Sequence, residues 1–444
     1  MWRVHPRLGK WALHYATLRL TATTSVRTAV NDATDEALSD EQPYSSDRYA
    51  RLVLNLGRAL LHVGSPAHRL ESSMQIMAER LGLQAEFFST PTALIVSLGD
   101  GDKQQTFLAR SDPGSANLSK LADLTEVMED LNEGRIDPQQ ADERVRAIDA
   151  APPLYGAWLQ VLAFVLIGGG VASLLGGGWR ESLMAAPLGA VAGGSIWWMQ
   201  QHVERSRLIM PMVAMLITFL GSLWCGFDGR TALMPAILAA MIPLLPGMDL
   251  TTAARELSTG HLVSGSSRLS FSVTVFALLA FGLVLGGMAG QAVVGPVALT
   301  EASFRPAWLP LVGLVSAAAG LMMLIQAHMR DWFWILMVSF IAWMGSGLGG
   351  WLEAPIVGAF VGGLAVGLAG NLFVLLSRRP SSILHIPGLI LLVPGSIGLR
   401  SLATLLQDNV VAGVETAILA GIIAVALTTG MILASVLLPP RNLL

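Results

Sequence analysis

The chain is poor in charge, in lysine and in cysteine, and each shortage restricts its class. Of its 444 residues only 13% are charged, whereas soluble domains carry about a quarter. Residues 1–156 hold 16 Lys and Arg with 21 Asp and Glu, but residues 157–444 hold 12 Arg, no Lys and 10 Asp and Glu. The first third is therefore predicted to be soluble and the rest to lie in a membrane. The net charge of −3 gives no basic surplus that would favour nucleic acid.

The single cysteine, Cys225, lies in an apolar run and excludes an internal disulfide. No metal-binding spacing is present, so neither a metal nor a cofactor is expected. The N-terminus also lacks an apolar segment of signal-peptide length. Residues 1–45 are predicted to be a disordered tail, in which LGKWALHYATLRL could form an amphipathic helix on a lipid surface.

Long apolar segments follow residue 156, and a membrane span needs about 20 apolar residues. Arginines in the connections favour a cytoplasmic position for both termini, because more of them fall on that side. The predicted fold class is an α-helical polytopic protein of the cytoplasmic (inner) membrane with a small N-terminal α+β domain. Its ten predicted spans centre on Phe164, Val191, Leu216, Leu238, Leu279, Ser316, Leu336, Leu364, Leu391 and Ala424.

Two of these segments are interrupted in the same way. LLPG at residues 244–247 and LVPG at residues 392–395 lie 148 positions apart. At that offset the membrane part divides into two halves of five spans, residues 157–294 and 305–438. Because five is odd, the halves would cross the membrane in opposite directions. This inverted repeat is common among secondary transporters.

The interruptions predict where a substrate binds. Proline removes a backbone donor, glycine permits a sharp turn, and the free N–H groups of a new helix attract a carboxylate. In the alternative interpretation, each Pro-Gly pair only ends a helix at the membrane surface. Asp249 is a candidate helix cap, proton carrier or amine ligand, Ser396 a candidate cap, and Arg400 a carboxylate ligand or an interfacial residue. The predicted substrate-binding residues are Pro246, Gly247, Asp249, Pro394, Gly395, Ser396 and Arg400.

Residues 46–151 are predicted to form a cytoplasmic α+β domain, with strands paired across the GDGD turn between two pairs of helices. Its second helix would start with Ser65 as the cap. Ser65, His68 and Glu71 share one face of this helix, which is compatible with the grouped residues of a hydrolase, but no nucleophile elbow is present. A docking or gating role at the cytoplasmic mouth is therefore favoured over a membrane-bound hydrolase, and no enzymatic activity is expected.

Several stretches resemble the threonine/serine exporter family of the ThrE type. GSPAHRLESSMQIMAERLGL resembles its N-terminal motif, and LLPGMDLTTAARELSTGHLVSGSSRLS and LVPGSIGLRSLATLL resemble its two Pro-Gly segments. The resemblance covers about residues 48–438. The positions that match the motifs, besides those at the breaks, are Gly64, Ser65, Arg69, Glu71, Gly265 and Arg268.

The resemblance implies an antiporter that exports small hydroxylated amino acids, threonine or serine, in exchange for protons. In some bacteria the two parts are separate proteins linked to dicarboxylate export, so an exporter of a dicarboxylate such as succinate is the alternative. The expected partners are a small-molecule substrate, protons and the lipid bilayer, and a homo-oligomer is a further candidate. A membrane-bound hydrolase and a passive channel are the remaining classes.

Overall fold

The computed structural model describes residues 46–99, 104–110, 116–200, 209–296, 301–352, 354–377, 379–392, 399 and 410–439. The predicted tail, residues 1–45, lies outside the described residues. The same holds for the second Pro-Gly break, with the predicted site residues Pro394, Gly395, Ser396 and Arg400.

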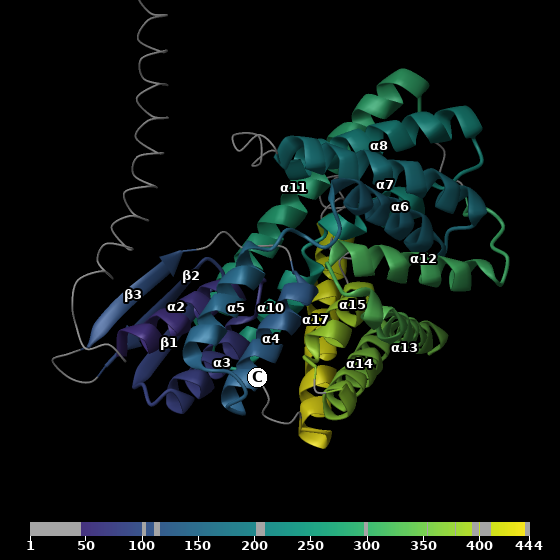
Figure 1. Ribbon diagram of the computed structural model, residues 1–444. Coiled ribbons are helices and arrows are strands. Elements are labelled where there is room, and N and C mark those ends of the chain that lie inside the picture. The colour runs from purple at the N-terminus through teal and green to yellow at the C-terminus, as the bar shows by residue number, and fades with distance from the viewer. Residues whose placement is uncertain are drawn as a thin grey trace, which may run out of the picture.

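Residues 46–150 contain a small antiparallel sheet with helices on one face (Figure 1). Alternate residues of the central strand, Leu94 and Val96, are fully buried against the helices, whereas Ile95 between them is 37% exposed. This alternation is what a half-buried strand requires. The strands pair in the order β1 (Ala85–Thr90), β2 (Ala93–Leu98) and β3 (Gln105–Arg110).

The helices of this region surround a core of its own, in which Leu56, Leu70 and Met74 are almost completely buried. Gly64, at φ +75°, lets the chain reverse between the first two helices in a backbone region that favours glycine. The four helices are α2 (Ser46–His62), α3 (Ala67–Arg80), α4 (Leu118–Asn132) and α5 (Pro138–Ala150).

The predicted cap of α3 is wrong. Pro66, not Ser65, holds the N-cap position, and no side chain caps the helix locally. The reason is tertiary: the backbone N–H of Ala67 at the helix start donates to Oε1 of Glu256, 189 positions away, at 3.0 Å. A carboxylate from the membrane part therefore satisfies a donor that a local hydroxyl was expected to take.

The membrane part begins with five consecutive helical segments, of which the fourth is bent. They are α6 (Ala157–Leu174), α7 (Trp179–Gln200), α8 (Ile209–Asp228), α9 (Leu233–Met241) continuing through η3 (Ile242–Leu244) into α10 (Gly247–Ser258), and α11 (Leu262–Val294). The next group contains α12 (Leu309–Leu324), η4 (Met329–Asp331) leading into α13 (Trp332–Trp351), α14 (Pro355–Ser377), α15 (Ser382–Leu392) and α17 (Val410–Leu437).

Each of the ten predicted centres lies in a helix, but fewer helices could cross a membrane on their own. Within the described residues, six are long and apolar enough, and the bent segment Leu233–Ser258 would make a seventh. The apolar helices α12 and α15 are shorter than a full span. The polytopic helical architecture is therefore confirmed, whereas the count of ten spans stays a prediction.

The first Pro-Gly break bends the chain sharply. The axis of Leu233–Leu244 and that of Gly247–Ser258 differ by 58°. Pro246 is the N-cap residue of α10, and Gly247 is its buried first residue. The predicted capping role of Asp249 is wrong, because this residue lies inside the first turn and pairs with Arg268 instead.

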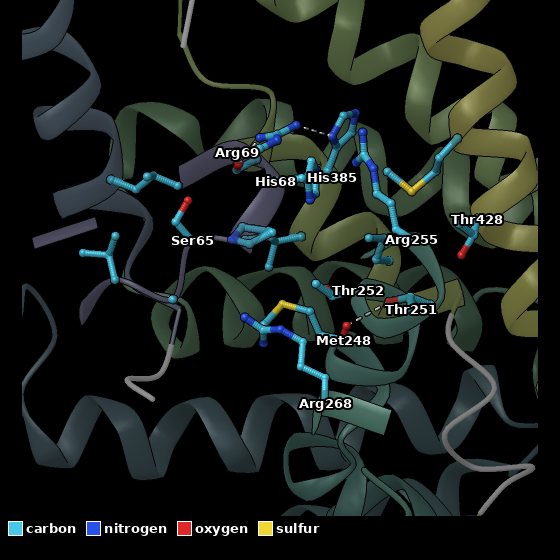
Figure 2. A pocket seen from close by; sticks show the side chains of 18 residues that line it. Ser65, His68, Arg69, Met248, Thr251, Thr252, Arg255, Arg268, His385 and Thr428 are labelled. Carbon is cyan, nitrogen blue, oxygen red and sulfur yellow. Dashed lines mark hydrogen bonds between the residues drawn. The ribbon is translucent and has the colours of Figure 1, made fainter. Parts of the chain in front are cut away.

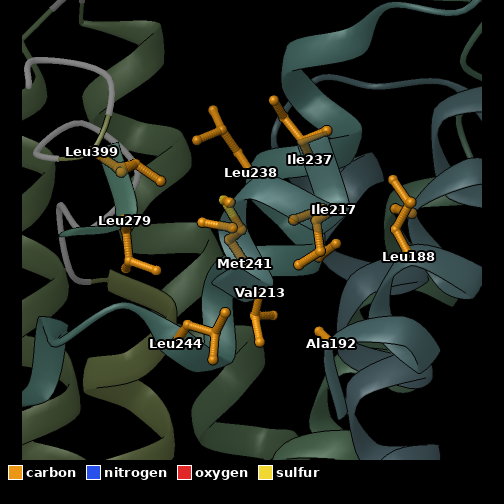
Figure 3. Close-up of a cluster of buried hydrophobic side chains, with 14 of the residues drawn as sticks. Leu188, Ala192, Val213, Ile217, Ile237, Leu238, Met241, Leu244, Leu279 and Leu399 are labelled. Carbon is orange, nitrogen blue, oxygen red and sulfur yellow. The ribbon is translucent and has the colours of Figure 1, made fainter. Parts of the chain in front are cut away.

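A buried cluster surrounds α9 and holds the first half of the membrane part together (Figure 3). Ile217 of α8, Met241 of α9 and Leu279 of α11 are fully buried in it. Leu399, which follows the second break, belongs to the same cluster. Side chains from before and after the connection between α11 and α12 therefore share one core around the bent segment.

A second buried centre joins three loops through one carboxylate. Glu181, at the start of α7, is 0% exposed. Its oxygens accept hydrogen bonds from the backbone N–H groups of Gly178, Ala232 and Ser303 and from the Ser303 hydroxyl. We call this arrangement the Glu181 clamp. It ties the connection between the two halves to the first half.

Candidate functional site

A pocket lies where the start of α3 meets the membrane helices α10, α15 and α17 (Figure 2). Its volume is about 70 Å³, and since one water needs about 10–15 Å³, it has room for a small solute. We call it the junction pocket. Its polar lining residues are Ser65, His68, Arg69, Thr251, Thr252, Arg255, Arg268, Ser382, His385 and Thr428.

Arg69 reaches from α3 across to α15. Its Nη1 donates to the Ser382 hydroxyl at 2.6 Å, and its Nη2 donates to the Ser381 hydroxyl at 2.7 Å. Nη2 also lies 3.4 Å from Nδ1 of His385. Burial, and then the charge of Arg255, lower the pKa of Arg69 to about 9. The guanidinium thus stays protonated at neutral pH in surroundings that poorly solvate its charge.

Arg255 extends from α10 toward the same space (Figure 2). Of the three arginines that line the pocket, Arg268 alone has a carboxylate within ion-pair distance among the residues that the structure describes. No aspartate or glutamate is among the pocket's described lining residues. A buried charge without a counter-ion is unfavourable, so Arg69 and Arg255 form a site to which an anion could bind.

Arg268 of α11 is neutralised by two carboxylates. Its Nη1 donates to Oδ1 of Asp249 at 2.8 Å, and its Nε lies 3.3 Å from Oε2 of Glu256 without hydrogen-bond geometry. Glu256 is 0% exposed and also accepts from the Ser264 hydroxyl at 2.8 Å and from the N–H of Ala67. This network fixes the start of α3 against α10 and α11.

His68 lies between these groups, and neither of its ring nitrogens has a hydrogen-bond partner among the residues that the structure describes. Burial first, and then the charge of Arg255, lower the pKa of His68 to about 2, so its ring is neutral near pH 7. Glu71 does not orient it. That carboxylate accepts from the N–H of Ser89 at 2.7 Å and lies 3.2 Å from Nε2 of His261. Ser65, His68 and Glu71 are therefore not hydrogen-bonded to one another as the groups of a hydrolase are.

The predicted site residues fall into three groups. The pocket brings together Gly64, Ser65, Arg69 and Arg268. Pro246, Gly247 and Asp249 form or support the adjoining start of α10, Glu71 lies beside the pocket, and Gly265 packs against Leu257. The remaining four, at the second break, lie outside the described residues.

Several pocket residues were not predicted as site residues from the sequence. Arg255 follows the first Pro-Gly break in the sequence, and a charge within an apolar segment often marks a functional site. His385 is also an ionisable residue within an apolar segment, so the same rule marks it as a candidate site residue. His68 was considered only as a member of a hydrolase group. Thr252 and Thr428 gave no signal, because threonine is common in membrane helices.

Two family descriptions match the chain, one in each half. "Putative threonine/serine exporter" matches residues 51–289, and "Threonine/Serine exporter, ThrE" matches residues 311–437. The first match begins in α2 and extends into α11. It therefore covers every described pocket element except α15 and α17.

Similar curated proteins come from fungi. An uncharacterized protein of Schizosaccharomyces pombe is 24% identical over 392 residues, which are 84% of this chain and 46% of that protein. Pheromone-regulated membrane protein 10 of Debaryomyces hansenii is 26% identical over 385 residues, which are 83% of this chain and 37% of that protein. The chain thus spans less than half the length of these relatives. No solved structure matches it.

Proposed function

Because this chain belongs to the threonine/serine exporter family, we propose that it is a secondary transporter whose junction pocket binds a small carboxylate-bearing solute. The observation that carries this proposal is the pair Arg69 and Arg255, which face one cavity without a carboxylate partner among the described residues. Arginine matches the two oxygens of a carboxylate and binds them more strongly than a neutral donor does.

Threonine or serine is the first candidate substrate. The carboxylate would bind between the two arginines, and the hydroxyl of the substrate would meet Thr252 or Thr428, which line the same pocket (Figure 2). The ammonium would need acceptors such as backbone carbonyls, since Asp249 is engaged by Arg268.

A dicarboxylate such as succinate is the second candidate. It is favoured by the composition of the lining, which has three arginines and no acidic side chain among the described residues. A second carboxylate would satisfy the surplus of positive charge, whereas an ammonium would add to it.

The start of α3 is proposed to act as one wall of the substrate site, which would give the N-terminal part a direct role in transport. Ala67 and Arg69 attach this wall to Glu256 of α10 and to Ser381 and Ser382 at α15. For the pocket to open on the side of α3, these hydrogen bonds must break. The proposed topology places this wall, with both termini, on the cytoplasmic side of the inner membrane.

Alternating access is proposed to follow from an inverted repeat with one half at residues 157–294 and the other at 305–438. Equivalent helices pair in the same way, since α8 packs along α11 and α14 along α17. Asp331, located 150 positions after Glu181, lies directly before the second helix of its half and pairs with Arg379 beyond the third helix. Glu181, in the first turn of the second helix of its half, accepts from the N–H of Ala232, which also lies beyond the third helix. These parallels support a repeat.

The test is efflux from liposomes that contain the full chain and are loaded with labelled threonine, serine or succinate, with and without a pH gradient. Arg255→Gln is compared with Arg144→Gln, which removes an arginine that is half exposed and far from the pocket in sequence. Saturable efflux that Arg255→Gln abolishes and Arg144→Gln retains is expected. The labelled solute that leaves identifies the substrate.

Efflux that does not saturate and ignores the gradient would indicate a channel instead. Efflux that is equally fast in both variants would remove the pocket from the transport path. Retention of all three solutes by the wild-type protein would refute the proposed substrate class.

A further inference from the structure

His68 presents two buried ring nitrogens to the junction pocket, and within the described part of the chain both lack a hydrogen-bond partner. A neutral imidazole has one N–H donor and one acceptor nitrogen. Leaving both unsatisfied in a buried place is unfavourable, so such groups usually have a ligand or a functional role. The side chain lies beside Arg255 and His385 in the pocket (Figure 2).

The charged groups around His68 are mainly positive once the carboxylates that already have partners are set aside. The elements packed around it contribute Arg69 and Glu71 from α3, Arg255 and Glu256 from α10, His261 and Arg268 at the start of α11, and His385 from α15. Both carboxylates in this group are already engaged, Glu71 by Ser89 and His261, and Glu256 by Ala67, Ser264 and Arg268.

The charges of Arg69 and Arg255 are not compensated in this way. Together with burial, which is the larger cause, they lower the pKa of His68 to about 2. With the pocket empty, the ring therefore binds no proton at any pH near neutrality.

An anion in the pocket would act against the part of this shift that the arginine charges cause. A carboxylate between Arg69 and Arg255 would offset the charge that opposes protonation, and it would offer an acceptor to the N–H of His68. Opposite charge and a hydrogen bond to the charged form both favour protonation.

We propose that the junction pocket binds a carboxylate and a proton together, with His68 as the residue that takes the proton. The proton comes from the solvent and is held on the imidazole as long as the carboxylate stays. This inference rests on the proposed function, because it uses the same pocket and the same arginines.

The test is calorimetric titration of the full chain in lipid nanodiscs with threonine and with succinate, at about pH 6. Each titration is repeated in two buffers of different ionisation enthalpy, so that the heat reports the number of protons taken up. Wild-type protein is expected to take up close to one proton per carboxylate solute bound. The affinity is expected to weaken by up to about tenfold per pH unit once the pH exceeds the pKa of the ligand-bound state.

His68→Gln should bind the same solute with no proton uptake and no such pH dependence. His62→Gln, which changes a histidine whose side chain is 41% exposed, is the matched control and should keep both. If the His68→Gln protein does not fold, the wild-type proton count and His68→Asn still decide the question.

Three outcomes separate this inference from the proposed function. Binding without proton uptake in the wild type, or proton uptake that persists in His68→Gln, overturns the inference and leaves the carboxylate site intact. Absence of binding by either solute in the wild type overturns both.

Discussion

The Glu181 clamp and the junction pocket are both buried polar centres, but their polar groups are satisfied to very different degrees. Glu181 accepts four hydrogen bonds from three residues, and Arg180 beside it pairs with Asp228 at 2.9 Å. The pocket differs within the described residues. There, Arg69 has only hydroxyl and imidazole partners, Arg255 has no carboxylate partner, and His68 has no hydrogen-bond partner.

This difference indicates what each centre does. Buried polar groups that satisfy one another stabilise a fold, because removing one leaves the others unpaired. Buried groups that are left unsatisfied lower stability, and a ligand can restore their interactions. The clamp is therefore expected to be structural and the pocket functional. Each of the following variants tests one side of that distinction.

The largest effect is expected from Glu181→Ala. It leaves the donors at Gly178, Ala232 and Ser303 without an acceptor in a buried place, which should reduce stability by about 3–5 kcal/mol. The melting temperature in detergent should fall by many degrees. Glu301→Ala, at an exposed glutamate two positions before Ser303, should leave it unchanged. Equal melting temperatures for the two variants would contradict a structural role of the clamp.

Arg255→Gln should weaken solute binding without lowering the stability of the fold. Loss of one charged hydrogen bond to a carboxylate corresponds to about 1.5–3 kcal/mol, or about 10–100-fold in affinity. The melting temperature should stay the same or rise, because a buried charge without a counter-ion is removed. Solute affinity from titration and the melting temperature are measured on the same preparation. A large loss of stability at unchanged affinity would make Arg255 a structural residue.

The stability of the empty protein should depend on His68 below pH 6.5. The unfolded chain binds a proton there, with an ordinary pKa of 6.5, while the folded chain does not until about pH 2. Stability due to this residue should thus decrease by about 1.4 kcal/mol per pH unit as the pH falls below 6.5. It should not change above 6.5. The free energy of unfolding of wild type and of His68→Gln is measured at pH 7 and at pH 5.5, and the difference between the two proteins isolates this contribution. An equal loss of stability in both proteins between these pH values would refute it.

The smallest effect on solute affinity is expected from the double variant Ser381→Ala and Ser382→Ala. These hydroxyls accept from the charged guanidinium of Arg69, and a hydrogen bond from a charged donor contributes about 1.5–3 kcal/mol to the stability of the contact. Their removal frees the guanidinium and loosens α3 from α15, so affinity should change by less than about tenfold and the rate of transport should change more. Ser266→Ala, on an exposed part of α11, is the control. A rate identical to wild type would argue against α3 as a moving wall.

Much of the fold could be predicted from the sequence because its signals are local. Each of the ten predicted apolar centres lies in a helix, and the bend at Pro246 and Gly247 occurs where the proline and glycine indicated it. The residue that caps the start of α3 was predicted wrongly, because the N–H of Ala67 donates to Glu256, which is distant in sequence.

Residue types over short stretches were enough to show which segments are apolar, where the chain breaks and to which family it belongs. Packing between distant segments was needed to show that the start of α3 forms a wall of the same pocket as α10 and α15. It was also needed to show that Asp249 neutralises Arg268, whereas Arg69 and Arg255 have no carboxylate partner among the described residues. Whether a buried charge has a counter-ion depends on packing between segments up to about 300 residues apart, and no local pattern encodes that.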